Sequence, residues 1–212
     1  MILPRILPVL LLALAALAAL PDRASAEPYA SELTPAARAR LENLARPRIV
    51  VAEFTESRHT PLKKKPVVVS GIVRIDRSRG LSLAYDQAGS PVVILDEKGL
   101  LLRRADGREQ PAPPEAADDL RLLHALFVFD LATLEKSYAL AATESADGAW
   151  TLSFTRRPDV AATYRELTLA GDAAHLTRIV LAKTPNLHTD IDLKPPQLDV
   201  TFSSEDLARY FR

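Results

Sequence analysis

The sequence predicts an α+β fold built around one antiparallel β-sheet. Between residues 54 and 85, apolar side chains alternate with polar ones in three successive segments, which is the pattern of strands with one buried face. From residue 138 to residue 203 the same alternation returns in six more segments, and turn sequences such as Asp147-Gly148 separate some of them. Helical patterns lie before, between and after these two groups of strands. We therefore expect a single sheet with helices covering one of its faces.

The first three strands are expected to build an apolar wall. The first strand should run from about Arg48 to Arg58, because the β-branched residues at positions 49–51 favour extended backbone. Side chains two positions apart share a strand face, so each strand contributes one row to the wall. The rows are Phe54 with Glu56 and Arg58, then Val69, Gly71, Val73 and Ile75, and then Leu81, Leu83 and Tyr85.

A helix is predicted ahead of the first strand. Thr34 is a favourable N-cap and Pro35 fits the first helical position, so the helix should begin there and end before Pro47. After the first strand, the lysines at positions 63–65 lie between two prolines that interrupt hydrogen-bonded structure. This indicates a solvated loop or, alternatively, a docking patch for an acidic partner.

The middle of the chain is expected to form a hairpin and then two helices. Residues 91–95 and 100–102 are apolar runs on either side of a glycine, which is typical of a hairpin. Residues 110–118 are predicted to be a connection without strand structure. Residues 120–127 then carry apolar side chains at helical spacing, and Asp130 would cap a second, shorter helix.

The last part of the chain is predicted to return to strands and to end in a short helix. Trp150 and Phe154 alternate with small polar residues, so this strand should bury one face. The acidic residues after Ser204 favour a helix start there, because they lie at the positive end of its dipole. The six predicted strands cover about residues 138–145, 149–156, 163–170, 175–184, 187–193 and 198–203.

The N-terminal segment is predicted to be a signal peptide. Arg5 precedes an apolar run that ends at Leu20, and the small residues that follow predict cleavage after Ala26. Residues 1–26 would then be removed on export to the periplasm, and residues 27–212 would form a single domain. Removal takes away two arginines and one aspartate from 27 basic and 27 acidic side chains, which leaves a net charge of about −1. This charge does not favour nucleic acid as a partner.

No motif for enzymatic chemistry is present in the sequence. The chain has no cysteine, and it lacks the GxSxG, HExxH and glycine-rich phosphate-binding patterns of common enzyme classes. We therefore expect a protein that is not an enzyme and that has no cofactor and no metal site.

Two groups of polar residues have alternative interpretations. Glu56 with Arg58 could be a catalytic acid with its tuning partner, but mutual neutralisation is favoured because an unpaired charge on an apolar wall is costly. His188, Asp190 and Asp192 could hold a metal ion from one strand face. A solvated polar face explains the same alternation and is the favoured interpretation.

The wall residues also form a sequence motif. Phe54 is followed, after a variable loop, by Gly71, by apolar residues at positions 73 and 75, and by Arg77. This arrangement resembles the LolA family of periplasmic lipoprotein carriers, in which an F-x-Q strand precedes a G-x-hydrophobic-x-hydrophobic-x-R segment and an aromatic-rich strand. Three positions depart from the family pattern and indicate a divergent member: Glu56 replaces glutamine, Ser78 replaces proline and Leu83 replaces tryptophan.

The resemblance implies a half β-barrel with lid helices around residues 118–138. It also implies a monomeric carrier, or chaperone, that takes lipoproteins or lipids from an inner-membrane donor to an outer-membrane acceptor. An apolar concavity would shelter acyl chains, since each buried methylene contributes about 0.8 kcal/mol. The residues expected to bind the acyl chains are Phe54, Val69, Val73, Ile75, Leu81, Leu83, Leu123 and Phe127.

Other functions on the same fold stay open at this point. The chain could be a lipid-sensing or structural module that regulates a partner protein, and an enzyme acting on lipid is a third interpretation. For Arg77, the resemblance implies a latch that fastens the lid through carbonyls around residues 123–129. Alternatively, Arg77 is a solvated turn residue like its neighbours Arg74 and Arg79.

Overall fold

The computed structural model of the chain describes residues 33–111 and 114–212. The predicted signal peptide, residues 1–26, lies outside the described residues. Within the described ranges, no helix is long and apolar enough to cross a membrane.

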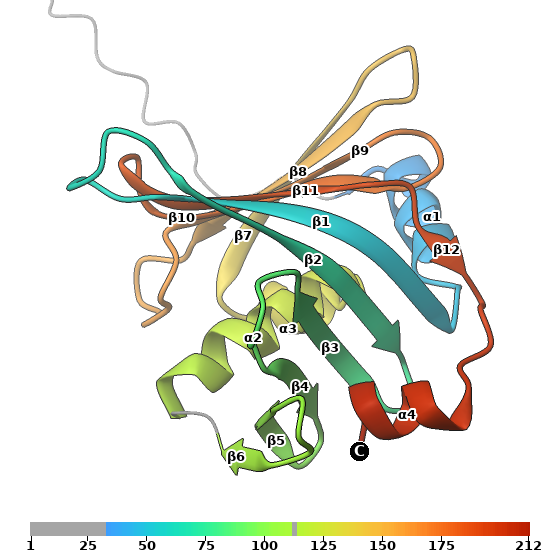
Figure 1. Cartoon of the computed structure of the whole chain (residues 1–212). Helices are drawn as coiled ribbons and strands as arrows, with labels where there is room; N and C mark the ends of the chain where they lie inside the picture. Colours follow the sequence, from blue (N-terminus) through green and yellow to red (C-terminus); the bar gives the residue numbers. More distant parts are fainter. Residues whose placement is uncertain (1–32, 112–113) are drawn as a thin grey trace, which may run out of the picture.

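The strands of the described chain form one twelve-stranded sheet (Figure 1). All of its strand pairs are antiparallel, as predicted from the alternating pattern. The strands are β1 (Ile49–His59), β2 (Val67–Asp76), β3 (Gly80–Tyr85), β4 (Val92–Asp96), β5 (Gly99–Arg103), β6 (Glu109–Pro111), β7 (Tyr138–Glu144), β8 (Trp150–Arg156), β9 (Glu166–Gly171), β10 (Leu176–Thr184), β11 (Leu187–Leu193) and β12 (Gln197–Leu198).

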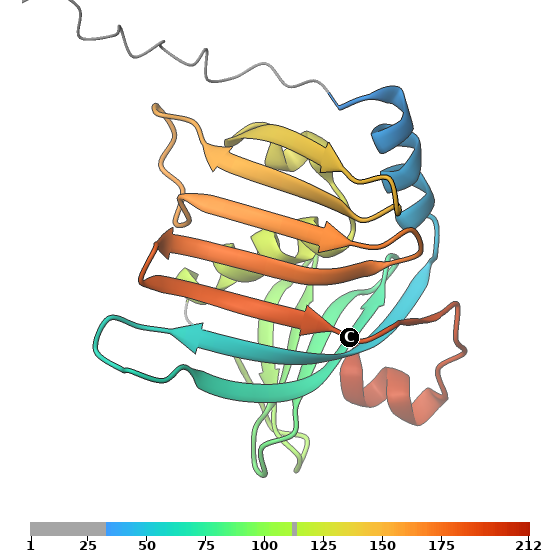
Figure 2. The same ribbon diagram turned by 90° about the horizontal axis from the view of Figure 1, so that it is seen from above.

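The order of the strands leaves the sheet open. From edge to edge it is β6-β5-β4-β3-β2-β1-β11-β10-β9-β8-β7, and the short β12 pairs with the beginning of β1. The sheet curls between its two edge strands, β6 and β7, around a concave face (Figures 1 and 2). The predicted α+β architecture, an antiparallel sheet curled into an incomplete barrel, is therefore confirmed.

The hairpin of β1 and β2 lies in the middle of the sheet. Its two strands pair continuously from Ile49 opposite Asp76 to Arg58 opposite Val67. A Cβ atom on Gly71 would lie 2.4 Å from the carbonyl oxygen of Ala84 and 3.0 Å from the ring of Phe54. The absence of a side chain at position 71 thus makes room for the Phe54 ring on the concave face, and this explains the glycine in the motif.

Three helices cover the concave face: α1 (Pro35–Leu44), α2 (Pro114–Phe127) and α3 (Leu131–Leu134). Figure 1 shows α2 and α3 beneath the sheet, and Figure 2 shows them behind the strands. Leu126 of α2 and Leu134 of α3 pack with Phe154 of β8 in one hydrophobic core, where each is at most 1% exposed. The predicted covering of the concave face by the first helix and the 118–138 helices is confirmed.

The predicted helix caps are present. Thr34 Oγ1 accepts a hydrogen bond from the backbone N–H of Ala37 at 3.2 Å, which begins α1. Asp130 Oδ1 accepts one from the N–H of Thr133 at 3.1 Å, which begins α3. Each cap satisfies a donor that the first turn of a helix leaves free.

The outer face of the sheet is covered in part by α4 (Ser204–Tyr210). Arg74 and Ile94 point outward, because alternation places them opposite the core-facing residues of β2 and β4. The guanidinium carbon of Arg74 lies 3.7 Å from the centre of the Tyr210 ring. Phe211, at the end of the helix, is 1% exposed, and Ile94 is fully buried. The terminal helix was predicted, whereas its docking onto the outer face was not.

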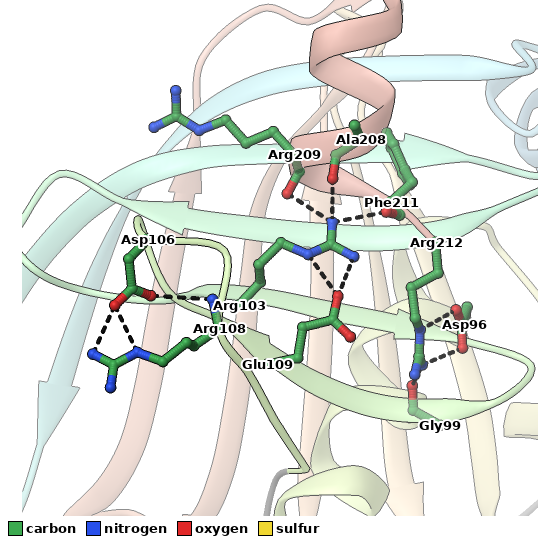
Figure 3. Close-up of polar contacts among 10 residues, drawn as sticks. All are labelled: Asp96, Gly99, Arg103, Asp106, Arg108, Glu109, Ala208, Arg209, Phe211 and Arg212. Carbon is green, nitrogen blue, oxygen red and sulfur yellow. Dashed lines mark hydrogen bonds and ion pairs between the residues drawn. The ribbon is translucent and has the colours of Figure 1, made fainter.

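Two arginines fasten the end of the chain to the β4–β5 hairpin (Figure 3). Arg212 donates to Asp96 Oδ2 at 2.6 Å and to the carbonyl oxygen of Gly99 at 2.5 Å. Arg103 supplies donors to carbonyls that the last turn of a helix leaves without partners, at the negative end of the dipole. Its Nη1 donates to the carbonyl oxygens of Ala208 at 2.6 Å, Arg209 at 3.1 Å and Phe211 at 2.8 Å.

The strand predicted over residues 198–203 is wrong, because only the two-residue β12 forms there. Asp199 has a φ of +50°, which turns the chain away from the sheet. Its Oδ1 accepts hydrogen bonds from the backbone N–H groups of Arg48 at 2.9 Å and Ile49 at 3.2 Å. The turn is therefore fixed by contacts to a segment about 150 positions earlier in the chain.

Two further boundaries differ from the prediction. The connection predicted over residues 110–118 is shorter, because β6 occupies residues 109–111 and α2 begins at Pro114, where proline fits the first helical position. Glu109 Oε1 accepts a hydrogen bond from Arg103 Nη2 at 2.7 Å, which holds β6 against β5. The strand predicted over 163–170 begins only at Glu166, since the loop from β8 extends to residue 165.

We expect the Arg103→Met variant to lose stability because α4 loses its anchor. Hydrogen bonds to a charged group contribute about 1.5–3 kcal/mol each, so losing this group of three should lower the free energy of unfolding in urea by at least about 1.5 kcal/mol. Arg108→Met, in the turn between β5 and β6, is the matched control. Arg108 pairs with Asp106 at 2.6 Å, but its side chain is 77% exposed, against 13% for Arg103. A change above about 0.5 kcal/mol in the control, or equal losses in both variants, would contradict this account of α4.

Candidate functional site

A cavity of about 400 Å³ lies beneath the concave face and is here called the large cavity, to distinguish it from a smaller one on the same face. A separate pocket of about 480 Å³ lies between the β2–β3 turn, the β4–β5 turn and α2. The large cavity is open to solvent on one side and is lined by α1, by β1 and β2, by the end of α2 and by the turn between β9 and β10, with Arg40, His175 and Lys194 among its lining residues. Most of the side chains that reach it from the sheet are apolar: Val50, Ala52, Val73, Ile75, Leu193 and Leu198. Ala39 and Asn43 of α1 are exposed to solvent and also line it, so α1 forms its rim.

A second cavity of about 130 Å³, the small cavity, lies between α2 and the strands β1, β3, β10 and β11. Its walls combine apolar residues with a few polar ones, namely Glu56, Tyr85, Asp119, Tyr164 and Thr189. Phe127 lines both cavities. The last residue of α2 therefore separates the two spaces.

Six of the eight residues predicted to bind acyl chains line one cavity or both. Val73 and Ile75 line the large cavity together with Phe127, and Phe127 also lines the small one with Phe54, Leu83 and Leu123. Their role in binding stays a prediction, whereas their common location on the concave side is a feature of the structure.

The other two predicted residues line neither cavity. Leu81 is fully buried in the hydrophobic core. Val69 is partly exposed, since it lies toward the hairpin end of β2, next to the exposed Val67 and Val68. In the sequence, all of these residues belong to inward-facing apolar rows. The pattern does not show which of them lie in the core, which line a cavity and which lie at an uncovered strand end.

Sequence reasoning missed part of the large cavity's wall. The contributions of α1 and of residues 173–176 in the β9–β10 turn were not foreseen. The spacing of Ala39 and Asn43, one helical turn apart, was a weak signal for the first. No local signal could reveal the second, because the curl of the sheet brings the β9–β10 turn beside α1.

Glu56 and Arg58 form a paired group beside the small cavity. Arg58 Nε donates to Glu56 Oε1 at 2.5 Å, and Arg58 Nη2 donates to Glu56 Oε2 at 3.1 Å. The hydroxyl of Tyr85 donates to Glu56 Oε2 at 3.2 Å. Burial, with the nearby Glu56 charge, raises the pKa of Tyr85 to about 12, so this hydroxyl stays a donor at neutral pH. The interpretation that Glu56 and Arg58 neutralise each other is confirmed.

Arg77 connects the β2–β3 turn to the end of α2. Its Nη1 donates to the carbonyl oxygen of Val128 at 3.3 Å, and its Nε donates to that of Pro47 at 3.0 Å. Val128 directly follows Phe127, the residue between the two cavities. Arg77 is exposed, but these two hydrogen bonds hold its guanidinium against the backbone, and partial burial lowers its pKa from the ordinary value.

The turn that presents Arg77 is held by Asp76, which sequence reasoning did not single out. Asp76 is 2% exposed, and its Oδ1 accepts hydrogen bonds from the backbone N–H of Ser78 at 2.8 Å and from the Ser78 hydroxyl at 2.6 Å. A proline at position 78 could not make the first of these bonds. Serine replaces the proline of the family pattern at this position, and here the turn is held by the two hydrogen bonds between Ser78 and Asp76.

The expectation that Arg74 and Arg79 are solvated neighbours of Arg77 holds only in part. Arg79 is largely exposed and lies 3.7 Å from Asp76. Arg74 points to the outer face beneath Tyr210, and burial lowers the pKa of its guanidinium. Arg79 is therefore the appropriate comparison for Arg77, whereas a change at Arg74 would disturb the docking of α4.

The first half of α2 is also attached to the sheet. Lys183 of β10 lies 4.0 Å from the carboxylate of Asp119, and its Nζ is 5.1 Å from the centre of the Tyr164 ring. Together with Arg77 at the other end, this contact ties the covering helix to two separate parts of the sheet.

No protein-family model matches the chain, and no curated protein matches it significantly. Similar solved structures include a DUF1329 family protein from Desulfovibrio piger, with a TM-score of 0.39 and 11% identity over 78% of this chain and 91% of the other. A candidate outer membrane lipoprotein-sorting protein domain from Vibrio parahaemolyticus has a TM-score of 0.42 and 9% identity over 80% and 93%. A LolA superfamily protein from Nitrosomonas europaea has a TM-score of 0.42 and 12% identity over 77% and 94%.

Proposed function

We propose that this protein is a periplasmic carrier that binds the acyl chains of lipoproteins or lipids and transports them toward the outer membrane. The observation that supports this most strongly is the large cavity of about 400 Å³ beneath the concave face. Its size falls within the range of about 300–1,000 Å³ that is usual for ligand pockets. In this proposal, residues 1–26 direct export and are removed after Ala26, and residues 27–212 act as one domain.

The energetics favour an acyl chain as the occupant. Each methylene that leaves water contributes about 0.8 kcal/mol, so a long chain gains roughly 10 kcal/mol when fully buried. The walls that face the large cavity from β1 and β2 are aliphatic, and they offer few hydrogen-bonding groups for a polar ligand. A lipid headgroup or protein moiety would stay at the rim, near Asn43 and Arg40 of α1.

The covering helix supports a mechanism for loading and release. Phe127 lies between the two cavities, so an outward movement of the end of α2 would join them into one longer space. The hydrogen bond from Arg77 to the Val128 carbonyl opposes this movement. Cargo then competes with the closed lid, and this competition lets a membrane-bound acceptor recover the acyl chain.

A bulky side chain in the large cavity should block acyl binding. We expect Val50→Phe to lose most of its affinity for a fluorescent fatty acid, because Val50 lines the cavity and the added ring would occupy it. Val51→Phe is the matched control, since the neighbouring side chain points to the outer face opposite Arg74. Circular dichroism should show both variants folded. Wild-type protein that binds no acyl probe, or equal binding by both variants, would refute the proposal.

Loss of the Arg77 contact should make the protein retain its cargo. Without it the closed lid loses about 1–3 kcal/mol, so Arg77→Leu should bind an acyl probe about 5- to 150-fold more tightly. Transfer of the probe to acceptor vesicles should slow accordingly, and amide exchange around residues 124–131 should become faster. Arg79→Leu is the control and should behave as wild type. If both variants transferred the probe equally well, Arg77 would not be a latch.

A further inference from the structure

On the outer face of the sheet, two histidines and one aspartate meet at the end of β1. His59 of β1 and His188 of β11 are directly opposite in the strand register. Their rings stack, with centres 4.2 Å apart and an interplanar angle of 13°. Asp190 Oδ2 lies 3.3 Å from His59 Nε2 and 3.7 Å from His188 Nε2. The group faces away from both cavities, because Glu56 and Ile191 occupy the opposite face of the same two strands.

The protein orients one of these imidazoles in the manner of a metal ligand. His188 Nδ1 lies 2.9 Å from the carbonyl oxygen of Pro185. A carbonyl can only accept, so Nδ1 carries the proton and Nε2 presents its lone pair toward Asp190. Ligating histidines usually donate their second ring N–H to a backbone carbonyl or a carboxylate in this way, which fixes the tautomer.

The distances suit a small divalent cation. The three ligand atoms lie within 4.8 Å of one another. Around a tetrahedral ion with bonds of about 2.0–2.1 Å, ligand atoms are separated by roughly 3.4 Å. The two contacts to Asp190, at 3.3 and 3.7 Å, bracket this value.

The surrounding charges leave one carboxylate oxygen available. Arg178 Nη2 donates to Asp190 Oδ1 at 3.1 Å and therefore holds the carboxylate with Oδ2 toward the histidines. The guanidinium of Arg178 also lies 3.9 Å from Asp192, whose negative charge offsets part of the repulsion between Arg178 and an ion. The side chains of His59, His188 and Asp190 are 35%, 25% and 14% exposed, so an ion can reach them from solvent.

We propose that His59, His188 and Asp190 bind one zinc-like divalent transition-metal ion, with water completing the coordination. Two imidazole nitrogens and one carboxylate oxygen are a donor set that suits Zn²⁺ and related ions. Bound there, the ion would join the last residue of β1 to β11, so it would stiffen the sheet next to the loop of the β1–β2 hairpin. The site differs from the one considered from sequence, because His59 takes the place of Asp192.

Isothermal titration calorimetry of the untagged, chelator-treated full-length protein with ZnCl₂ tests this proposal. The expected result is one ion per chain. His59→Ala, His188→Ala and Asp190→Asn should each weaken binding by at least tenfold, since loss of an outer partner alone costs about that much. Affinity should also fall as pH is lowered, because protons compete for the imidazoles. An excess of Zn²⁺ should raise the melting temperature of the wild-type protein but not that of the three variants.

His175→Ala is the matched control. His175 Nε2 lies 3.3 Å from Asp172 Oδ2, which is the same kind of pair without a second imidazole, so this variant should bind like wild type. Nitrogen-15 NMR of the wild-type protein gives a readout that needs no variant. Of the four histidines in the chain, only His59 and His188 should shift when Zn²⁺ is added. No stoichiometric binding, equal affinities in all four variants, or shifts at His124 and His175 alone would each overturn the proposal.

Discussion

The apolar concave face of the open sheet is shielded from water by helices. This hydrophobic contact between the sheet and its covering helices is the interaction on which the rest of the structure depends. Alternation gives the strands an apolar inner row, and α2 covers it with Leu123, Leu126 and Phe127. Two polar contacts join this segment to the sheet: Arg77 donates to the Val128 carbonyl just after the helix, and Lys183 lies beside Asp119 within it. A covering segment of this kind can shift as a unit when the contact at one end is released.

The helices do not fill all of the space over the concave face, and two cavities remain. Protein interiors are packed closely and contain few voids larger than a water molecule. Two clefts of about 400 and 130 Å³ on one side of the sheet therefore leave part of the concave face without close packing. An acyl chain that fills them would restore the missing van der Waals contacts, which is why a carrier function follows more naturally from this architecture than a purely structural one.

Much of the fold could be predicted because its signals are local. Strand alternation and the caps at Thr34 and Asp130 can be recognised within a few residues, whereas the room that Gly71 leaves for Phe54 depends on the register of β1 with β2. Local signals do not distinguish the different environments that an inward-facing apolar side chain can have. Val69, Leu81 and Val73 all read as inward-facing apolar residues, although one is partly exposed, one lies in the core and one lines a cavity.

The features that could not be predicted depend on pairs far apart in the chain. Arg103 anchors carbonyls more than 100 positions later, and Asp199 ends β12 by binding backbone N–H groups about 150 positions earlier. His59 meets His188 only because β1 pairs with β11 in one particular register. From sequence these histidines were scattered polar residues, and only the strand order brings them together.

Native mass spectrometry of the protein from the cells that produce it, purified without detergent or added lipid, tests the central claim most directly. A carrier should retain part of its cargo through such a purification. The account predicts a polypeptide with the mass of residues 27–212 and, on a fraction of the molecules, an additional mass that fragments to fatty acids. A protein that consistently carries no acylated molecule, or that carries a polar ligand in its place, would contradict it.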